Sequence, residues 1–325
     1  MWPLVLSFSP FFLLVALGSL STRLRWLPHQ GLGTLSTFVL YLALPAMLFR
    51  LGAGGALHQP GLGKLLLAYT LAGTVILALA LGWTVQRRLG RRDGGLAALA
   101  TVFPNTGFLG LPLLTGLMGP QAAGPVAATV VVDVLLFSSL CLAWAHSQSH
   151  GRNDGPAQAA MASLKGALRN PLLWSMALGM LWGQTGLMLP TPIDDTLRLL
   201  GLAATPAALV TLGGILVRPV RPDADAHGHR PLNLAALSVP AVLKLVVHPV
   251  LVWGCVGGPT GQGLAGAALI MAAALPSASN VSMMAEREGA RTPAVPRIIL
   301  LTTALAVVSL AVWAHALGLT PQSRS

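Results

Sequence analysis

Long apolar stretches alternate with short polar loops along the whole chain. A helix of about 20 apolar residues spans the hydrocarbon core of a bilayer. By this measure the pattern predicts ten spans, over residues 4–20, 31–49, 65–85, 95–118, 124–145, 171–189, 197–217, 233–255, 262–285 and 296–317. We therefore expect an all-α membrane protein with ten transmembrane helices.

One polar stretch is longer than the other loops and separates the fifth predicted span from the sixth. It covers residues 146–170 and divides the chain into a five-helix unit over 1–145 and another over 171–325. Five is an odd number, so the two units are expected to insert in opposite orientations. Pro45 in the second span and Pro206 in the seventh hold corresponding positions, which favours an inverted repeat.

Lys and Arg are distributed unevenly between the two sets of loops. Fifteen lie in loops that follow odd-numbered spans, four lie on the opposite side, and Lys244 lies inside a span. Cytoplasmic loops carry the excess of basic residues. The bias predicts a multi-pass protein of the inner (plasma) membrane, with both termini outside the cytoplasm and the 146–170 linker inside. Arg23 and Arg25 follow the first span rather than precede it, so we expect a retained helix and not a cleaved signal peptide.

Two spans are interrupted by proline, asparagine and small residues. Phe103–Pro112 reads FPNTGFLGLP and Ala274–Asn280 reads ALPSASN, and each lies in the fourth span of its half. Irregular backbone survives in a bilayer only where protein or a water-filled cavity satisfies its polar groups. Paired broken helices at corresponding positions are typical of transporter binding sites, whereas two simple proline kinks would only shape the bundle.

The breaks also suggest what they bind. Half-helices that restart near Gly107 and near Val281 would expose free N–H groups and positive dipole ends, which attract anions. We predict a substrate site formed by Pro104, Asn105, Thr106, Gly107, Pro112, Pro276, Ser277, Ser279 and Asn280.

Three ionisable residues lie deep inside predicted spans. Asp133 occurs in VVVDVLLFSS, and Lys244 and His248 occur one helical turn apart in AVLKLVVHPV. Ionisable residues at this depth usually face the bundle interior and are often paired. Asp133 and Lys244 could pair as a fixed structural unit, or these three residues could couple transport to an ion.

Composition excludes several other classes of protein. Charged residues are only 9% of the chain, and its net charge of +11 is scattered over loops, so we expect membrane lipid and not nucleic acid as a partner. Asp194 and Asp195 lie together in a predicted short loop without a second acidic cluster, and no nucleotide or hydrolase motif is present, so we expect no enzyme. Cys141 and Cys255 are predicted as buried apolar residues, and neither a metal nor a cofactor is expected.

Five segments together resemble the auxin efflux carrier family, which includes the plant PIN transporters and many bacterial permeases. They read FVLYLALPAMLF, FPNTGFLGLPLL, LVTLGGIL, LKLVVHPVL and ALPSASNVSMMAE. The resemblance implies two inverted five-helix repeats with crossed broken helices four and nine, as in bile-acid symporters. It also implies a scaffold of spans one, two, six and seven, a moving transport domain, and a homodimer through the scaffold. Plant relatives carry an acidic and a basic residue in span three, and this chain has neither there.

These observations predict an efflux permease that moves a small organic anion, such as an aromatic or dicarboxylic acid, by alternating access. A sodium-driven importer of organic anions on the same fold is the nearest alternative. A membrane receptor that binds without transporting is a third, which the lack of a sizeable soluble domain disfavours.

Overall fold

The computed structural model describes residues 2–55, 61–147, 161, 165, 171–217, 234–257, 263–289 and 294–319. Within these residues every regular element is helical, and an isolated β-bridge joins Pro104 to Ser277. The predicted all-α class is therefore confirmed. Most of the predicted 146–170 linker lies outside the described residues.

The helices of the first half run from the N-terminus to Ala145. They are α1 (Trp2–Arg23), α2 (His29–Phe38), η1 (Val39–Ala43), α3 (Leu44–Ala53), α4 (Leu62–Gln86), α5 (Arg91–Val102), η2 (Thr106–Gly110), α6 (Leu111–Met118), η3 (Pro120–Ala122), α7 (Ala123–Val132), η4 (Asp133–Phe137) and α8 (Ser138–Ala145).

The helices of the second half begin at Pro171. They are α10 (Pro171–Gln184), α11 (Thr191–Leu216), α12 (Leu234–Val242), η6 (Leu243–Val247), α13 (His248–Cys255), α15 (Gly263–Ala274), α16 (Asn280–Arg287) and α17 (Ala294–Ala316). The segments η1, η2, η4 and η6 are π-helical turns.

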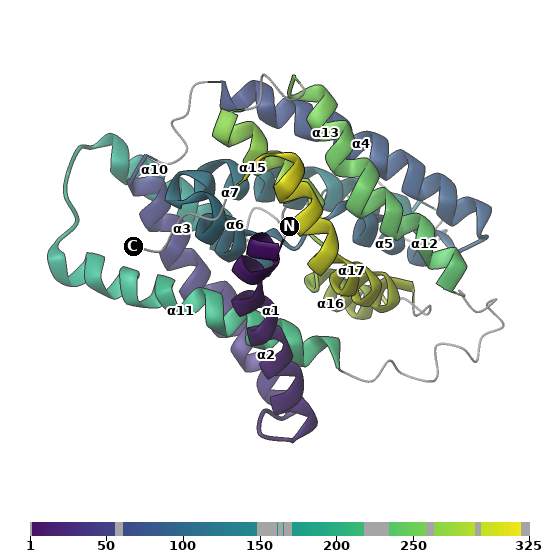
Figure 1. Ribbon diagram of the computed structural model, residues 1–325, viewed down its shortest axis with the longest axis horizontal. Coiled ribbons are helices and arrows are strands. Elements are labelled where there is room, and N and C mark those ends of the chain that lie inside the picture. Colours follow the sequence, from purple (N-terminus) through teal and green to yellow (C-terminus); the bar gives the residue numbers. More distant parts are fainter. Residues whose placement is uncertain are drawn as a thin grey trace.

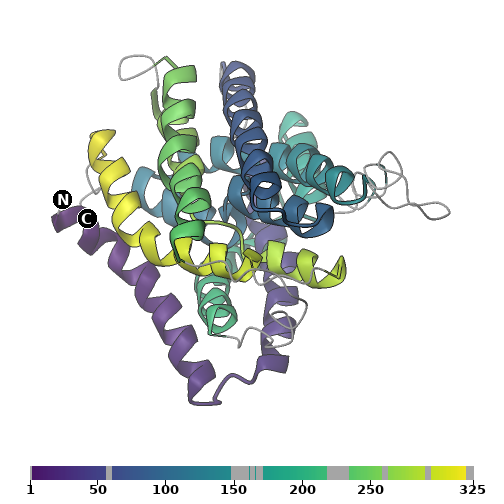
Figure 2. The same cartoon turned by 90° about the vertical axis from the view of Figure 1, so that its right-hand side faces the viewer.

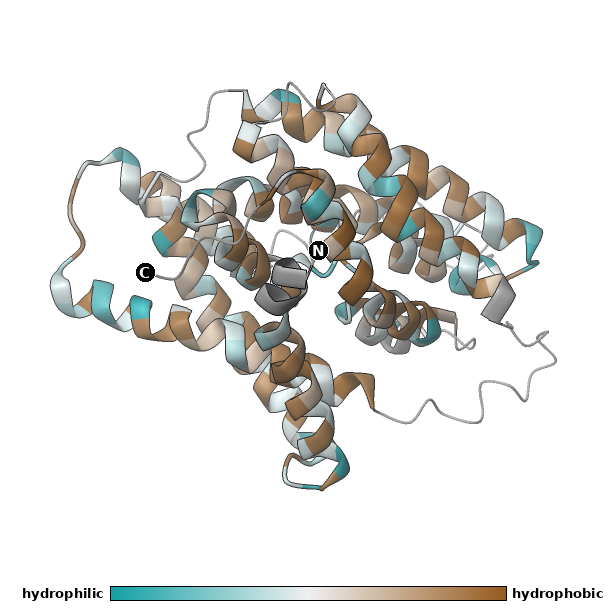
Figure 3. Cartoon of the chain, viewed as in Figure 1, coloured by the Kyte–Doolittle hydropathy of each residue, from teal (hydrophilic) through white to brown (hydrophobic). Residues whose placement is uncertain are grey.

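Among the residues that the structure describes, six continuous helical segments are long and apolar enough to cross a membrane. They are Gln30–Ala53, Leu62–Gln86, Pro120–Ala145, Thr191–Leu216, Ala236–Cys255 and Ala294–Ala316. The segments Thr106–Met118 and Gly263–Ala274 are apolar but shorter, because each belongs to an interrupted span. Figure 3 shows the apolar colouring along most of the helices, with polar residues mainly near their ends and in loops.

The surface of α4 shows why such a helix belongs in lipid. Leu67, Leu71, Val75 and Leu79 are spaced by four residues and are all exposed. The opposite face, which includes Tyr69, is buried against the rest of the protein. A helix with apolar side chains on both faces suits a protein interior on one side and hydrocarbon on the other.

The helices form two packed groups (Figures 1 and 2). In the first, α3 packs against α10, and α11 packs against α1, α2 and α3. In the second, α4 to α8 pack with α12, α13, α15, α16 and α17. Here α13 lies beside α4 and α15, and α5 lies beside α4, α8 and α17. We call them the glycine-packed group and the crossing group, for reasons given below.

Glycines allow the backbones of the first group to approach closely. A Cβ at Gly179 of α10 would overlap the Phe49 carbonyl of α3, and a Cβ at Gly18 of α1 would overlap the Val210 carbonyl of α11. Small residues at helix contacts are a common means of packing helices in membranes, where the hydrophobic effect does not drive association. The glycine-packed group is thus held by close backbone contact.

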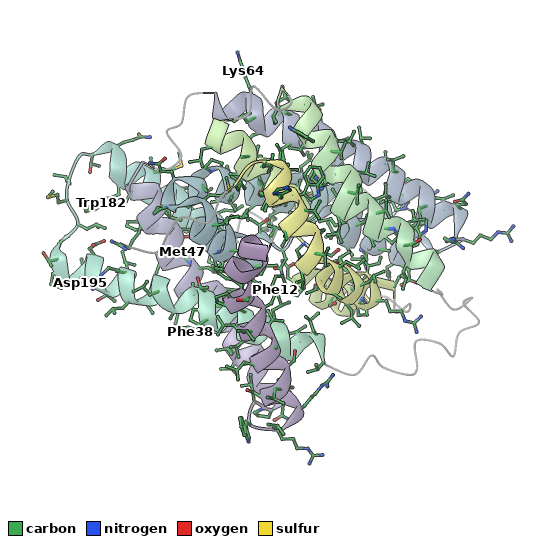
Figure 4. The ribbon with its side chains drawn as sticks, viewed as in Figure 1. Phe12, Phe38, Met47, Lys64, Trp182 and Asp195 are labelled. Carbon is green, nitrogen blue, oxygen red and sulfur yellow. The ribbon has the colours of Figure 1, made fainter. Side chains whose placement is uncertain are left out.

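An ion pair joins α3 to α11 in the glycine-packed group. The Arg50 guanidinium on α3 donates to both Asp194 carboxylate oxygens on α11, at 2.7 and 3.0 Å. Asp194 and Asp195 both lie within α11, with Asp194 in its first turn, so the prediction of a loop there was wrong. Acidic residues suit this position because the N-terminal end of a helix is positive. Figure 4 shows Asp195 and Trp182 on the outer edge of this group, and Lys64 of α4 pointing away from the helices.

The cysteines differ from each other. Cys141 is buried in α8, as predicted, but Cys255 at the end of α13 is exposed. If Cys255 has an apolar environment, that environment is lipid and not protein. The hydropathy of a sequence does not distinguish these two environments.

Candidate functional site

The first break lies between α5 and η2. Pro104 has no N–H to continue the α5 ladder, and α5 ends at Val102 with Phe103 already extended (φ −78°, ψ 112°). Asn105 lies outside both helices (φ −78°, ψ 56°), and helix resumes at Thr106. The chain is therefore interrupted over three residues, close to where the sequence predicts it.

The second break lies between α15 and α16. The first of these helices ends at Ala274 and the second begins at Asn280. Pro276 again removes a main-chain donor, and small residues occupy the rest of the gap. This break also lies where the sequence predicts it.

The structure brings the two breaks together through their main chains. The N–H of Asn105 donates to the Pro276 carbonyl at 2.8 Å, and the N–H of Ala278 donates to the Phe103 carbonyl at 3.0 Å. Pro104 and Ser277 form the antiparallel bridge between these bonds. We call residues 103–106 and 276–280 the crossing. Its hydrogen bonds satisfy backbone groups that would otherwise be unpaired and buried.

Side chains from two neighbouring helices complete this pairing. The buried ammonium of Lys244, in η6, lies 3.2 Å from the Val102 carbonyl and 3.1 Å from the Ala273 carbonyl. The Thr302 hydroxyl of α17 accepts the N–H of Ser277 at 3.1 Å. The crossing is thus anchored to η6 and to α17.

Several buried side-chain atoms of the crossing have no hydrogen-bond partner. They are Asn105 Nδ2, Thr106 Oγ1, Ser277 Oγ, Ser279 Oγ and Asn280 Oδ1. Buried polar groups of native proteins are usually paired, so a cluster of five that are not indicates a place where a polar ligand or water binds. All five belong to residues that the sequence predicts for the substrate site.

The remaining predicted site residues have other positions. Pro112 lies at the start of α6, where proline is compatible with a helix, and takes no part in the main-chain pairing described above. Gly107 lies within η2, and a Cβ there would meet only Leu44 Cδ1, at 3.8 Å. The helix restarts at Thr106, one residue before Gly107 and close to the predicted restart, and Gly107 does not have a positive φ.

Asp133, Lys244 and His248 are all completely buried, but their contacts differ from the predicted pairing. Asp133 Oδ1 accepts the hydroxyl of Tyr69 at 3.0 Å. The Tyr69 ring lies 5.5 Å from the His248 ring, and His248 Nδ1 lies 3.4 Å from Lys244 Nζ. Within the described ranges no direct ion pair joins Asp133 to Lys244, which was one of the two alternatives left open by the sequence. The four residues instead form a chain of neighbours that ends at the crossing, which we call the Asp133–Lys244 chain.

Two contributors were missed by the sequence reasoning. Tyr69 lies in a span that was noted only for lacking charge, and Thr302 occurs in an ordinary apolar pattern. The signal for Tyr69 was its hydroxyl in the middle of an apolar helix, since a buried tyrosine O–H usually finds a partner. Thr302 gave no comparable signal, because threonine often bonds to its own helix.

The described residues hold no group of three or more His, Cys, Asp or Glu that could bind a metal ion. What the crossing offers is different: hydroxyl and amide groups at the beginnings of two half-helices. Such groups bind a polar ligand by hydrogen bonds and helix dipoles.

Comparison with known proteins identifies the family of the chain. Residues 4–314 match the family described as "Membrane transport protein". A protein of Rhizobium meliloti (strain 1021), named "Putative malonate transporter", is 28% identical over 305 residues, which cover 92% of this chain and 91% of that protein. An "Uncharacterized transporter" of Methanothermobacter thermautotrophicus is 27% identical over 92% of this chain and 94% of its own length.

A plant protein matches over a shorter stretch. The "Probable auxin efflux carrier component 9" of Oryza sativa subsp. japonica is 25% identical over 157 residues, which cover 43% of this chain and 37% of that protein. The matched family is one of transporters and not of enzymes. With the family match extending over nearly the whole chain, this protein belongs to the Membrane transport protein family, the auxin efflux carrier family that its sequence resembles.

Proposed function

We propose that this protein is a secondary transporter that exports a small organic anion across the inner membrane by alternating access, with its substrate bound at the crossing. The observation that supports this most is the cluster of five unpartnered polar atoms where two interrupted helices meet. Interrupted helices that meet in this way hold the substrate in many secondary transporters.

The electrostatics of the crossing favour an anion. The segments that begin at Thr106 and Asn280 both start at the crossing, so two positive dipole ends meet there. The Asn105 amide nitrogen is an unpartnered donor beside them. A carboxylate would accept hydrogen bonds from this amide and from the hydroxyl groups of Thr106, Ser277 and Ser279. We propose a dicarboxylic acid such as malonate as the first substrate to test, because a relative matched over 91% of its length is named "Putative malonate transporter". Aromatic acids are the second group to test.

We propose that the ten spans predicted from the sequence all cross the membrane, as two inverted five-helix repeats over residues 1–145 and 171–325. In this arrangement the 146–170 linker is cytoplasmic and both termini are outside. The crossing group would move as the transport domain against the glycine-packed group, which corresponds to spans one, two, six and seven. The close backbone contacts of the glycine-packed group suit a static scaffold, and we propose that the homodimer forms through it.

The driving force follows from the charge of the substrate. An anion that leaves a cell with a negative interior gains about 2.3 kcal/mol per charge per 100 mV. Export could thus proceed without coupling. We propose that Asp133, Lys244 and His248 additionally couple transport to an ion, since they are buried and lie in the chain that ends at the crossing.

The proposal is tested with purified protein in sealed proteoliposomes. A thermal-shift screen of small carboxylates first identifies a ligand, because a compound that binds the folded state raises its melting temperature. Flux of that compound, driven by a membrane potential, should then exceed flux in protein-free vesicles. Binding without flux would contradict transport and favour a receptor.

The ion dependence is decided in the same vesicles. An imposed pH gradient should change the flux, and Asp133→Asn should remove this response. Uptake that requires a sodium gradient would instead favour the importer. The unpartnered oxygens of Ser277, Ser279 and Asn280 are the atoms that could bind sodium in that case.

A further inference from the structure

Lys244 contacts both halves of the crossing at once. It lies in η6 with its side chain fully buried, and its ammonium donates to the carbonyls of Val102 and Ala273. These carbonyls belong to the last residue of α5 and the second-to-last residue of α15. A single cation therefore lies at the C-terminal ends of two half-helices, where the partial charge is negative.

The breaks explain why these two carbonyls are available. In a continuous helix each would accept the N–H four residues later, which belongs to Thr106 and to Ser277 respectively. The N–H of Thr106 bonds to the Pro104 carbonyl, and the N–H of Ser277 bonds to the Thr302 hydroxyl. Lys244 replaces the lost bond on both sides, which makes the two contacts equivalent.

We propose that Lys244 is a positioning residue that holds the C-terminal ends of the two half-helices together and so sets the geometry of the crossing. Its three ammonium protons match three neighbours: the two carbonyls and His248 Nδ1. Because the negative helix ends are neutralised by Lys244, only the positive ends remain for an anionic ligand. This role rests on the proposed function only in taking the crossing as the substrate site.

A simpler role for Lys244 is to balance the buried charge of Asp133. Both residues are completely buried, and among the described residues no direct ion pair joins them. Removing Lys244 alone would leave Asp133 as an uncompensated buried charge, which often prevents folding, whereas removing both charges is usually tolerated. In Asp133→Asn alone, Lys244 keeps its two carbonyl partners at the negative helix ends. The informative protein is therefore the double variant Lys244→Met with Asp133→Asn, compared with Asp133→Asn alone.

Hydrogen–deuterium exchange of the full-length protein in detergent gives a readout that needs no substrate. In the double variant, amide exchange in peptides over residues 103–110 and 275–282 should be about tenfold faster than in Asp133→Asn, as expected when a hydrogen bond of ordinary strength is lost. Peptides of α1 and α11 should not change, because Lys244 does not contact the glycine-packed group. Arg50→Gln is the control, since it removes a cation that bonds within that group.

Equal exchange rates at the crossing in the double variant and in Asp133→Asn would overturn the proposal. So would equally faster exchange in all helices, which would show a general structural role. If the double variant does not fold, Lys244→Gln with Asp133→Asn is measured in the same way, because glutamine keeps a neutral donor. In this variant, faster exchange at the crossing than in Asp133→Asn alone supports the proposal. An exchange rate equal to that of Asp133→Asn alone overturns it. Failure to find a transported anion would contradict the proposed function without affecting these rates.

Discussion

The main-chain N–H of Asn105 donates a hydrogen bond to the carbonyl oxygen of Pro276 across 2.8 Å, although the two residues are far apart in sequence. This bond uses backbone atoms only. The amide side chain of Asn105 is therefore left without a hydrogen-bond partner on its nitrogen. The same residue thus joins the two interrupted helices with its backbone and presents a free donor with its side chain.

Asn105→Leu separates these two roles. The backbone bond to Pro276 remains, so the variant should fold and show a melting temperature close to that of the wild type. The donor is lost, and flux of the identified anion in proteoliposomes should fall by at least about tenfold, the effect of losing about 1.4 kcal/mol of binding. Wild-type flux through Asn105→Leu would rule out a role for this amide in substrate binding.

Thr302 and Thr303 are a matched pair of residues that tests whether a side chain stabilises the second break. The Thr302 hydroxyl accepts the N–H of Ser277, whereas the buried Thr303 hydroxyl has no partner. Thr302→Val leaves a buried N–H unpaired and should destabilise the protein by about 1–3 kcal/mol.

Thr303→Val removes an unsatisfied hydroxyl and should be neutral or stabilising, because valine has nearly the same shape. Thermal unfolding of both variants in the same detergent measures the difference. Equal melting temperatures would mean that Thr302 does not support the second break.

Tyr69→Phe tests the Asp133–Lys244 chain. Only the hydroxyl that donates to Asp133 is removed, and the other carboxylate oxygen of Asp133 already lacks a partner. Loss of a hydrogen bond to a buried acidic group should lower the stability by about 1.5–3 kcal/mol. The protein has two tyrosines, and the other, Tyr41, is exposed. Tyr41→Phe is therefore the control and should not change the stability. A Tyr69→Phe melting curve that overlays the control would contradict this contact.

Gly179→Ala tests the packing between α3 and α10. A Cβ at this position overlaps the backbone carbonyl of Phe49, which cannot move like a side chain. We therefore expect the free energy of unfolding to fall by more than ~1 kcal/mol and the yield of folded protein to be poor. Gly107→Ala introduces the same methyl group where the nearest atom is 3.8 Å away, and should fold normally. Size-exclusion profiles of the two variants from parallel preparations provide the comparison.

The helices and the two breaks could be predicted from sequence, because proline removes a donor wherever it occurs and apolar length is a local property. The restart near Gly107 could also be predicted, and the helix resumes at Thr106, directly after Asn105. The partner of Asp133 could not be predicted, since it depends on how α4 and η4 are rotated toward each other. Both Tyr69 and Lys244 were chemically suitable. In the structure the Phe137 ring packs directly against Gly73 of α4, and the Tyr69 hydroxyl of the same helix donates to Asp133.

Because hydrogen bonds of the main chain maintain the crossing, its architecture does not depend on which side chains occupy positions 105, 277 and 279. Such positions can change without dismantling the meeting point of the two helices. If the crossing binds the substrate as proposed, a few substitutions at these positions could change which substrate is accepted during evolution, while the proline-interrupted backbone stays the same.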